Sequence, residues 1–401
     1  MKRSFKRMLS MGLLAAVLLC VFSFGGVFAA GDATDTVRAG RLTGKNWMSG
    51  IPDDRYLYEI NLPGTHDCVT AYCKNTTDNA VKLFGRPVYD SGEYAKTQSL
   101  TLSEQLNAGV RYLDLRFSAK QGKLLLCHGN NERIAVINKI MQGLDAFNPS
   151  RALLHRESPP FLELDTEFYA YKDAGCTVPF TGKRVFSLLK RFLKKHPSET
   201  IIITAKKENG DTNEFFRLFK KQIERLKTEI NPATQQPYLY TENGNGLYTK
   251  MPALSQVRGK IILMTPFYEE LQTGDMLDSK NKAGQTDFMG MTFRYENHWS
   301  VPSCLKTMFV HRFLKKTAIE MSADGEQHLP VANLLKTNAS VVLLQSPQTI
   351  AAKVNDFLYR QNRLKKGWYY GWIMGDFMTK ETCAAIWQTN NFVFDYSRKD
   401  V

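Results

Sequence analysis

The sequence predicts an α/β protein that folds as a single (β/α)8-type barrel of irregular form. Short apolar, β-branched runs alternate with amphipathic helical patterns, and no linker or low-complexity stretch divides the chain. Eight of these runs have the composition of strands, the number that such a barrel requires. The predicted strands occupy residues 62–67, 112–117, 123–129, 200–206, 260–267, 289–295, 340–346 and 370–377.

Two gaps between these runs carry clear helical patterns. Residues 184–195 place Val185, Leu189 and Phe192 on one face, with lysines and arginines on the opposite face. Residues 213–229 repeat this arrangement with a phenylalanine-rich face. We interpret both apolar faces as packing surfaces and assign no function to them.

The N-terminal segment has the composition of a secretory signal peptide. Basic residues at positions 2, 3, 6 and 7 precede an apolar run, and the small residues Ala29 and Ala30 follow it. No second apolar stretch is long enough to span a bilayer. We therefore expect residues 1–30 to be removed, residues 31–401 to form one barrel domain, and the protein to be secreted to the outside of the cell.

The chain is basic, with 53 Lys and Arg residues against 39 Asp and Glu residues. The leader holds four of the basic residues and no acidic one, so the remaining chain keeps a surplus of ten. Such a surplus attracts anionic partners, whether lipid surfaces or nucleic acid. Because the basic residues are spread over helix faces without a nucleic-acid-binding motif, we expect no nucleic-acid partner.

Polar and charged residues stand at the C-terminal ends of five separate predicted strands, the edge at which barrel enzymes carry their active sites. Two histidines, several carboxylates and one arginine are what metal-free cleavage of a phosphodiester requires: a base, an acid and a cation for the charge on phosphorus-bound oxygens. Carboxylates beside the imidazoles fix their tautomers. Any one of these residues alone would more often be structural. The candidates are His66, Asp67, Asp114, Arg116, His128, Lys206 and Asp376.

The same segments carry a family resemblance. LPGTHD, GVRYLDLR, CHG, PSETIIITAKKE, GKIILM and GWIMGDF follow one another from about Pro52 towards the C-terminus. In this order they resemble the motifs of the bacterial phosphatidylinositol-specific phospholipases C, the X-domain type. The resemblance implies a catalytic barrel over residues 31–401. It also implies a lyase that releases diacylglycerol and a cyclic inositol phosphate by acid-base catalysis.

The resemblance implies a role for each catalytic residue. His66 takes the part of the general base, with Asp376 as its carboxylate partner. His128 takes the part of the general acid, with Asp67 as its partner. Arg116 is implied to bind the phosphate.

The resemblance also bears on supporting residues and on cofactors. Asp114 is implied to hold Arg116 in place, and Lys206 is implied to line the substrate pocket. Metal-dependent relatives carry carboxylates for Ca²⁺ at the position of Arg116. An arginine there implies that no metal and no other cofactor takes part.

The chain departs from the family at two contacts to inositol. Simple bacterial members carry an arginine just after the GKI strand, where this chain has Thr265 and Pro266. They also carry an aspartate two residues before a tyrosine. If Tyr295 is that tyrosine, Phe293 takes the place of the aspartate. Arg294 and Tyr295 are therefore, with the pocket lysine, the candidate substrate-binding residues.

Three functions remain open at this point. The chain is interpreted as a phosphodiesterase that acts on phosphatidylinositol or related inositol phospholipids. The alternatives are the same chemistry on a different phospholipid head group, or an inactive relative that binds lipid or glycan. We expect a phospholipid substrate at a membrane surface, peripheral contact with the membrane, and a monomer.

Overall fold

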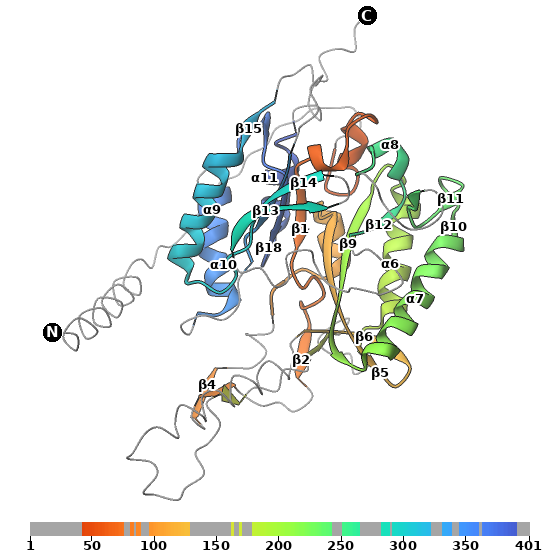
Figure 1. The fold of residues 1–401 in the computed structure, drawn as a ribbon, viewed down its shortest axis with the longest axis horizontal. Coiled ribbons are helices and arrows are strands. Elements are labelled where there is room, and N and C mark those ends of the chain that lie inside the picture. Colours follow the sequence, from red (N-terminus) through yellow and green to blue (C-terminus); the bar gives the residue numbers. More distant parts are fainter. Residues whose placement is uncertain are drawn as a thin grey trace, which may run out of the picture. The chain divides into compact units, whose positions relative to one another are not determined.

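The computed structural model describes most of the chain beyond the expected leader (Figure 1). The predicted segment 1–30 lies outside the described residues. The structure describes residues 42–75, 81–83, 86–89, 96–128, 162–163, 168–170, 179–242, 251–264, 282–288, 291–321, 331–338, 345–360 and 363–390.

A curled, mostly parallel sheet forms the centre of the fold, as a distorted and partly open barrel. Seven strands run parallel and an eighth, β13, runs antiparallel to β14. Between the described residues of β12 and β13 no ladder closes the barrel. The predicted fold class is confirmed. In spatial order the strands are β12 (Ile261–Leu263), β9 (Ile201–Gly210), β5 (Tyr112–Lys120), β1 (Leu62–Thr65), β18 (Trp372–Gly375), β16 (Ala332–Lys336), β14 (Met291–Glu296) and β13 (Ala283–Phe288).

The strand prediction differs from the structure in two respects. The run at 123–129 forms β6 (Lys123–His128), which pairs antiparallel with β5 as a hairpin and is not one of the parallel strands. The strands β13 and β16 were not predicted, because polar residues within them break the apolar pattern. Most of the predicted strand at 340–346 lies outside the described residues.

Helices pack on the outside of the sheet. The predicted helices are confirmed as α6 (Gly182–Lys195) and α7 (Thr212–Thr228), which lie beside β5, β6 and β9. Thr181 and Asp211 cap their first turns by accepting hydrogen bonds from backbone N–H groups. On the other side of the sheet, α9 (Ser303–Thr317) and α10 (Pro347–Asn355) pack together beside β14 and β16.

Several shorter elements complete the described chain. None of the described helices is long and apolar enough to cross a membrane. The short helices are α3 (Leu102–Ala108), α8 (Leu254–Val257), α11 (Lys380–Trp387), the 3-10 turns Trp47–Gly50 and Leu57–Glu59, and the π-helical turn Asp356–Arg360. The short strands are β2 (Cys73–Asn75), β3 (Val81–Leu83), β4 (Arg86–Tyr89), β7 (Leu162–Glu163), β8 (Phe168–Ala170), β10 (Ile230–Asn231), β11 (Gln236–Pro237), β15 (Ile319–Glu320) and β17 (Trp368–Tyr369).

Aromatic side chains fill the interior of the sheet. Trp372 is fully buried, and its ring centroid lies 5.3 Å from that of Tyr112 and 5.7 Å from that of Phe293. Its indole N–H donates to the Leu57 carbonyl at 2.9 Å, so the polar atom is satisfied. These rings come from β5, β14 and β18, and they support the strand ends that carry the candidate catalytic groups.

A buried ion pair closes the opposite, N-terminal end of β5. Arg111 Nε and Nη2 lie 2.9 and 2.6 Å from Glu199 Oε2, and both side chains are fully buried. Burial raises the pKa of Glu199 although Arg111 lowers it, so removing this pair from water is costly. Loss of one partner would leave the other charge buried and unpaired.

We therefore expect Glu199→Gln to lower the free energy of unfolding by about 3–5 kcal/mol in denaturant titrations. The matched control is Glu224→Gln, which removes an exposed partner of Lys227 on α7 and should cost less than about 1 kcal/mol. Equal effects of the two substitutions would contradict this account of the buried pair.

Candidate active site

The predicted catalytic groups meet at the C-terminal edge of neighbouring strands. His66 and Asp67 follow β1, and Asp376 follows β18, the parallel neighbour of β1. On the other side of β1, Asp114 and Arg116 lie on β5. Because parallel strands end at the same edge of the sheet, five residues from three separate segments of the chain lie within one site.

His66 lies at the centre of this group and is 9 % exposed. Its Nδ1 is 2.8 Å from Asp376 Oδ1, and its Nε2 is 2.9 Å from Arg116 Nη2. A carboxylate only accepts and a guanidinium only donates, so Nδ1 carries the proton and the lone pair of Nε2 is available as an acceptor. The contacts therefore hold His66 in the tautomer that a general base needs.

The pKa of His66 is raised. Burial alone would lower it, but the carboxylates of Asp67 and Asp376 outweigh burial because they stabilise the imidazolium. Arg116 acts in the opposite direction. A raised pKa strengthens His66 as a proton acceptor.

Asp67 links the two histidines to the arginine. Its Oδ2 is 2.5 Å from His128 Nδ1 and 3.3 Å from His66 Nε2, and its Oδ1 contacts Arg116 Nε. Burial would raise the pKa of Asp67, yet Arg116 and the two histidines hold it well below its usual range. The carboxylate therefore stays ionised and contacts the imidazole of His128.

Arg116 is surrounded by carboxylates from three segments. Besides Asp67, it donates from Nε and Nη2 to Asp114 Oδ2 at 3.1 and 3.0 Å, and from Nη1 to Glu208 Oε1 at 2.7 Å. These charges raise the pKa of Arg116 despite its burial. The guanidinium is thus fixed in the position from which it can meet an anion.

Glu208 is a site residue that the sequence analysis missed. It lies on β9 beyond Lys206, and the Lys206 Nζ is 3.6 Å from Glu208 Oε1. The β5–β9 ladder shifts register at this point, where Phe117 pairs with Lys207 and Ser118 with Asn209. Glu208 is the residue without a register partner at this shift, and its carboxylate contacts the arginine. Its only sequence signal was its position two residues after the predicted lysine.

Gln98 was also missed, although it holds two catalytic strand ends together. Its fully buried amide donates from Nε2 to the carbonyls of His66 and Gly375, both at 2.9 Å. These carbonyls belong to the segments that carry His66 and Asp376. Gln98 therefore fixes the separation of His66 and Asp376 without approaching a substrate.

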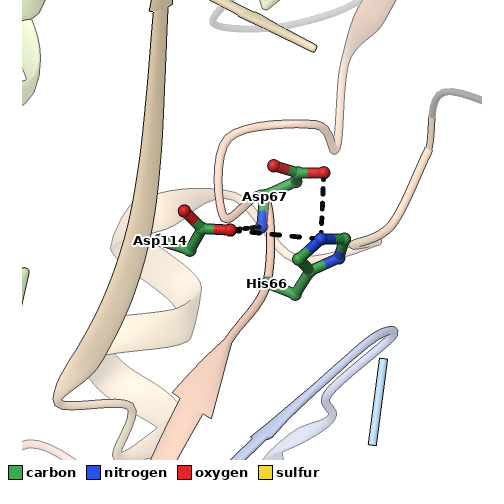
Figure 2. A group of neighbouring side chains, drawn as sticks. All are labelled: His66, Asp67 and Asp114. Carbon is green, nitrogen blue, oxygen red and sulfur yellow. Dashed lines mark hydrogen bonds and ion pairs between the residues drawn. The ribbon is translucent and has the colours of Figure 1, made fainter. Parts of the chain in front are cut away.

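The cluster does not fit a metal ion, although three of its residues have suitable ligand atoms. Figure 2 shows the side chains of His66, Asp67 and Asp114 converging, with their ligand atoms within 4.8 Å of one another. Arg116 already contacts the same three residues. A metal cation placed among them would be repelled by the positive charge of the guanidinium. It would also have to compete with the guanidinium for these carboxylate oxygen atoms.

The two candidate binding residues on β14 lie on opposite faces of the sheet. Tyr295 is 2 % exposed and lies on the inner face, two residues from Phe293. Arg294 lies on the other face by strand alternation, where its charge opposes but does not outweigh the burial that raises the pKa of Tyr369. The structure does not bring Arg294 into the cluster around His66, and Thr265 and Pro266 lie outside the described residues.

Comparisons with known proteins identify chains of similar sequence. No family model matches the chain. The 1-phosphatidylinositol phosphodiesterase of Listeria monocytogenes is 25 % identical over 384 residues, which cover 95 % of this chain and 96 % of that relative. Over almost its whole length the chain is therefore similar to a bacterial phosphatidylinositol-specific phospholipase C. The enzyme of the same name from Staphylococcus aureus is 25 % identical over 251 residues, 63 % of this chain and 56 % of that relative.

Solved structures of this phospholipase C family share the fold. A double mutant of the Staphylococcus aureus enzyme aligns with a TM-score of 0.58 at 18 % identity, over 87 % of this chain and 97 % of the other. The Listeria monocytogenes enzyme aligns with a TM-score of 0.53 at 21 % identity, over 87 % and 99 %. The distorted barrel is therefore the fold of the family.

Because Arg116 holds the oxygen atoms that a metal would need, we expect catalytic activity to persist in excess EDTA. The measurement is the rate of phospholipid cleavage before and after dialysis against chelator, with a Ca²⁺-dependent phospholipase as the control. Loss of activity that added Ca²⁺ restores would contradict the assignment of Arg116.

Proposed function

We propose that this chain is a secreted, metal-independent phosphodiesterase that cleaves phosphatidylinositol or a related inositol phospholipid into diacylglycerol and a cyclic inositol phosphate. One observation carries the proposal. His66 is paired to Asp376 and His128 to Asp67, and both His66 and Asp67 contact a buried arginine at the C-terminal edge of the barrel. The relatives named 1-phosphatidylinositol phosphodiesterase support the same substrate class.

In this mechanism His66 acts as the general base. The ring 2-hydroxyl of the substrate gives its proton to Nε2 as its oxygen attacks phosphorus, while Nδ1–H stays hydrogen-bonded to Asp376. The imidazolium that forms is stabilised by Asp376 and Asp67, which already raise the pKa of His66. The base is therefore tuned by the same carboxylates that orient it.

Protonated His128 acts as the general acid. Its Nδ1 faces Asp67, so the proton on Nε2 is the one available for the leaving group. As the bond from phosphorus to the glycerol oxygen breaks, this proton passes to that oxygen and diacylglycerol leaves. Asp67 keeps the ring in place before and after the transfer.

Arg116 has two tasks in this scheme. In the structure its Nη2 lies 2.9 Å from His66 Nε2, and the lone pair of that nitrogen accepts the hydrogen bond. A phosphate oxygen that accepts from Nη2 would take over this hydrogen bond and leave Nε2 free to receive the hydroxyl proton. Substrate binding would thus release the base while the guanidinium stabilises the charge on the phosphate oxygens.

The remaining expectations form part of the proposal. The leader at 1–30 would direct the chain out of the cell, and residues 31–401 would form the catalytic domain. The substrate lies in a membrane, so we propose peripheral contact with a lipid surface. One of the Staphylococcus aureus structures concerns the modulation of that enzyme's membrane binding. We propose a monomer and no nucleic-acid partner.

Two alternatives differ in substrate or in activity. The same site would cleave a phospholipid with another head group, since Phe293 and Pro266 replace two charged inositol contacts of simple bacterial relatives. An inactive lipid- or glycan-binding relative is the other alternative. The complete set of paired histidines argues against it, because binding alone does not require two oriented proton-transfer groups.

The decisive experiment is to incubate the purified protein with phosphatidylinositol, a glycosylated phosphatidylinositol and phosphatidylglycerol in identical micelles. Phosphorus NMR should detect a cyclic phosphate from the inositol lipids. We expect His66→Ala and His128→Ala each to lower kcat by at least ~10²-fold, because each removes one proton-transfer group. Turnover of phosphatidylglycerol alone would establish the different head group, and no turnover of any lipid would support the inactive relative.

The pH profile provides a separate prediction. His66 must be neutral to act as a base, so kcat/KM should fall as the pH drops below its raised pKa. Asp376→Asn removes one of the charges that raise this pKa, and the acidic limb of the profile should therefore move to lower pH, with a reduced maximum. An unchanged limb, or one that moves to higher pH, would show that another group controls it.

A further inference from the structure

Lys336 is a buried lysine to which neither the sequence nor the proposed mechanism gives a role. It is the last residue of β16 and is only 6 % exposed. Lys336 pairs in register with Met374 of β18, and Met374 pairs with Gly64 of β1. Register partners in parallel strands point to the same face, so Lys336 projects from the face that carries Asp376 and His66.

The sheet order places Lys336 on the side of His66 away from the other cations. Arg116 on β5 and Lys206 on β9 lie on one side of β1, whereas β18 and then β16 lie on the other. By register, Lys336 starts two residues deeper in the barrel than His66. Its side chain therefore approaches the site from the N-terminal side of the strand ends, which we call the floor of the site.

The charges around Lys336 belong to the candidate active site. Its electrostatic partners are Asp114 and Arg116 from β5, Lys206 from β9 and Asp67 after β1. Burial lowers the pKa of Lys336 to about 7, with Arg116 and Lys206 acting in the same direction and the carboxylates against it. Near neutral pH, a small change in the local charge changes the protonation of this amine.

The backbone of Lys336 is held by a second buried lysine. Lys306 of α9 is fully buried, and its Nζ donates to the Lys336 carbonyl at 2.6 Å and to Glu296 Oε1 at 3.3 Å. The end of β16 is thereby fixed to α9 and β14. A side chain that projects from such a fixed point is positioned before any ligand arrives.

A protonated Lys336 would offset part of the negative charge that a bound anion adds to the site. Apart from the two histidines, the site holds four carboxylates and only three side chains with a basic group. A phosphate that enters such a site adds one more negative charge in a region of low dielectric. The carboxylates are Asp67, Asp114, Glu208 and Asp376, and the basic groups are those of Arg116, Lys206 and Lys336.

We propose that Lys336 is a head-group-binding residue whose amino group donates to an anionic oxygen of the substrate from the floor of the site. This inference rests on the proposed function, since it places the substrate among the same residues. The approaching anion favours the charged amine, so binding near neutral pH takes up a proton at Lys336. Arg294, on the other face of β14, does not take this role.

The test compares the wild type with Lys336→Met, which keeps the side-chain length and removes the amine. Lys353→Met on α10 is the matched control, because Lys353 is exposed and lies outside the site. We expect Lys336→Met to raise KM for phosphatidylinositol about 10- to 100-fold, the range for a hydrogen bond to a charged group, with kcat changed much less. The control should match the wild type, and thermal unfolding of both variants verifies that they are folded.

A second measurement uses the wild type and needs no phospholipid turnover. Calorimetric titration with myo-inositol 1-phosphate at pH 7, in two buffers of different ionisation enthalpy, should report proton uptake that Lys336→Met abolishes. Unchanged KM and Kd in the variant, or binding by the wild type without proton uptake, would overturn the inference. An equal loss of affinity for uncharged myo-inositol would overturn the anionic contact. If the wild type cleaves no phospholipid, the proposed function fails, while this titration still decides the role of Lys336.

Discussion

A buried guanidinium shared among carboxylates is the interaction on which the rest of the site depends. Arg116 is held by Asp67, Asp114 and Glu208, which come from three different segments of the sheet edge. Each of these ions loses several kcal/mol of hydration on burial, and only close pairing offsets that loss. The strand ends must therefore keep their relative positions, and the histidines that contact the same carboxylates are fixed with them. Asp67 in particular contacts Arg116, His66 and His128, so a shift of the arginine would change the surroundings of the proposed base and of the proposed acid together.

The sequence was sufficient to place the residues that lie on apolar strands or directly after them. His66 and Asp376 each stand where a regular apolar run ends, Arg116 lies on the apolar strand β5, and the barrel edge brings the three together. His128 was placed correctly at a strand end, but its strand forms an antiparallel hairpin on β5. The periodicity of a short strand is the same in parallel and antiparallel pairs, so the sequence pattern alone does not reveal its direction.

The rest of the site depends on tertiary features that no local pattern encodes. Glu208 contacts the arginine at a register shift between β5 and β9, and the composition of the strand does not reveal such a shift. Lys336 ends a strand that also contains Asn333, and this polar character hid the strand. Arg294 was considered because of its neighbours in sequence. Alternation along β14, which the pairing with β16 fixes, puts it on the opposite face from Tyr295.

One backbone feature explains how two adjacent residues serve one site. Successive side chains of a strand point to opposite faces, so a continued strand would carry Asp67 away from His66. The backbone of Asp67 instead has a φ of 41°, in the left-handed region that aspartate tolerates better than most residues. Its N–H then donates to Asp114 Oδ2 at 3.3 Å, which helps to retain this conformation. The turn brings the carboxylate back to the imidazole of His66, and this is why two consecutive residues can both belong to one site and Asp67 can contact both histidines.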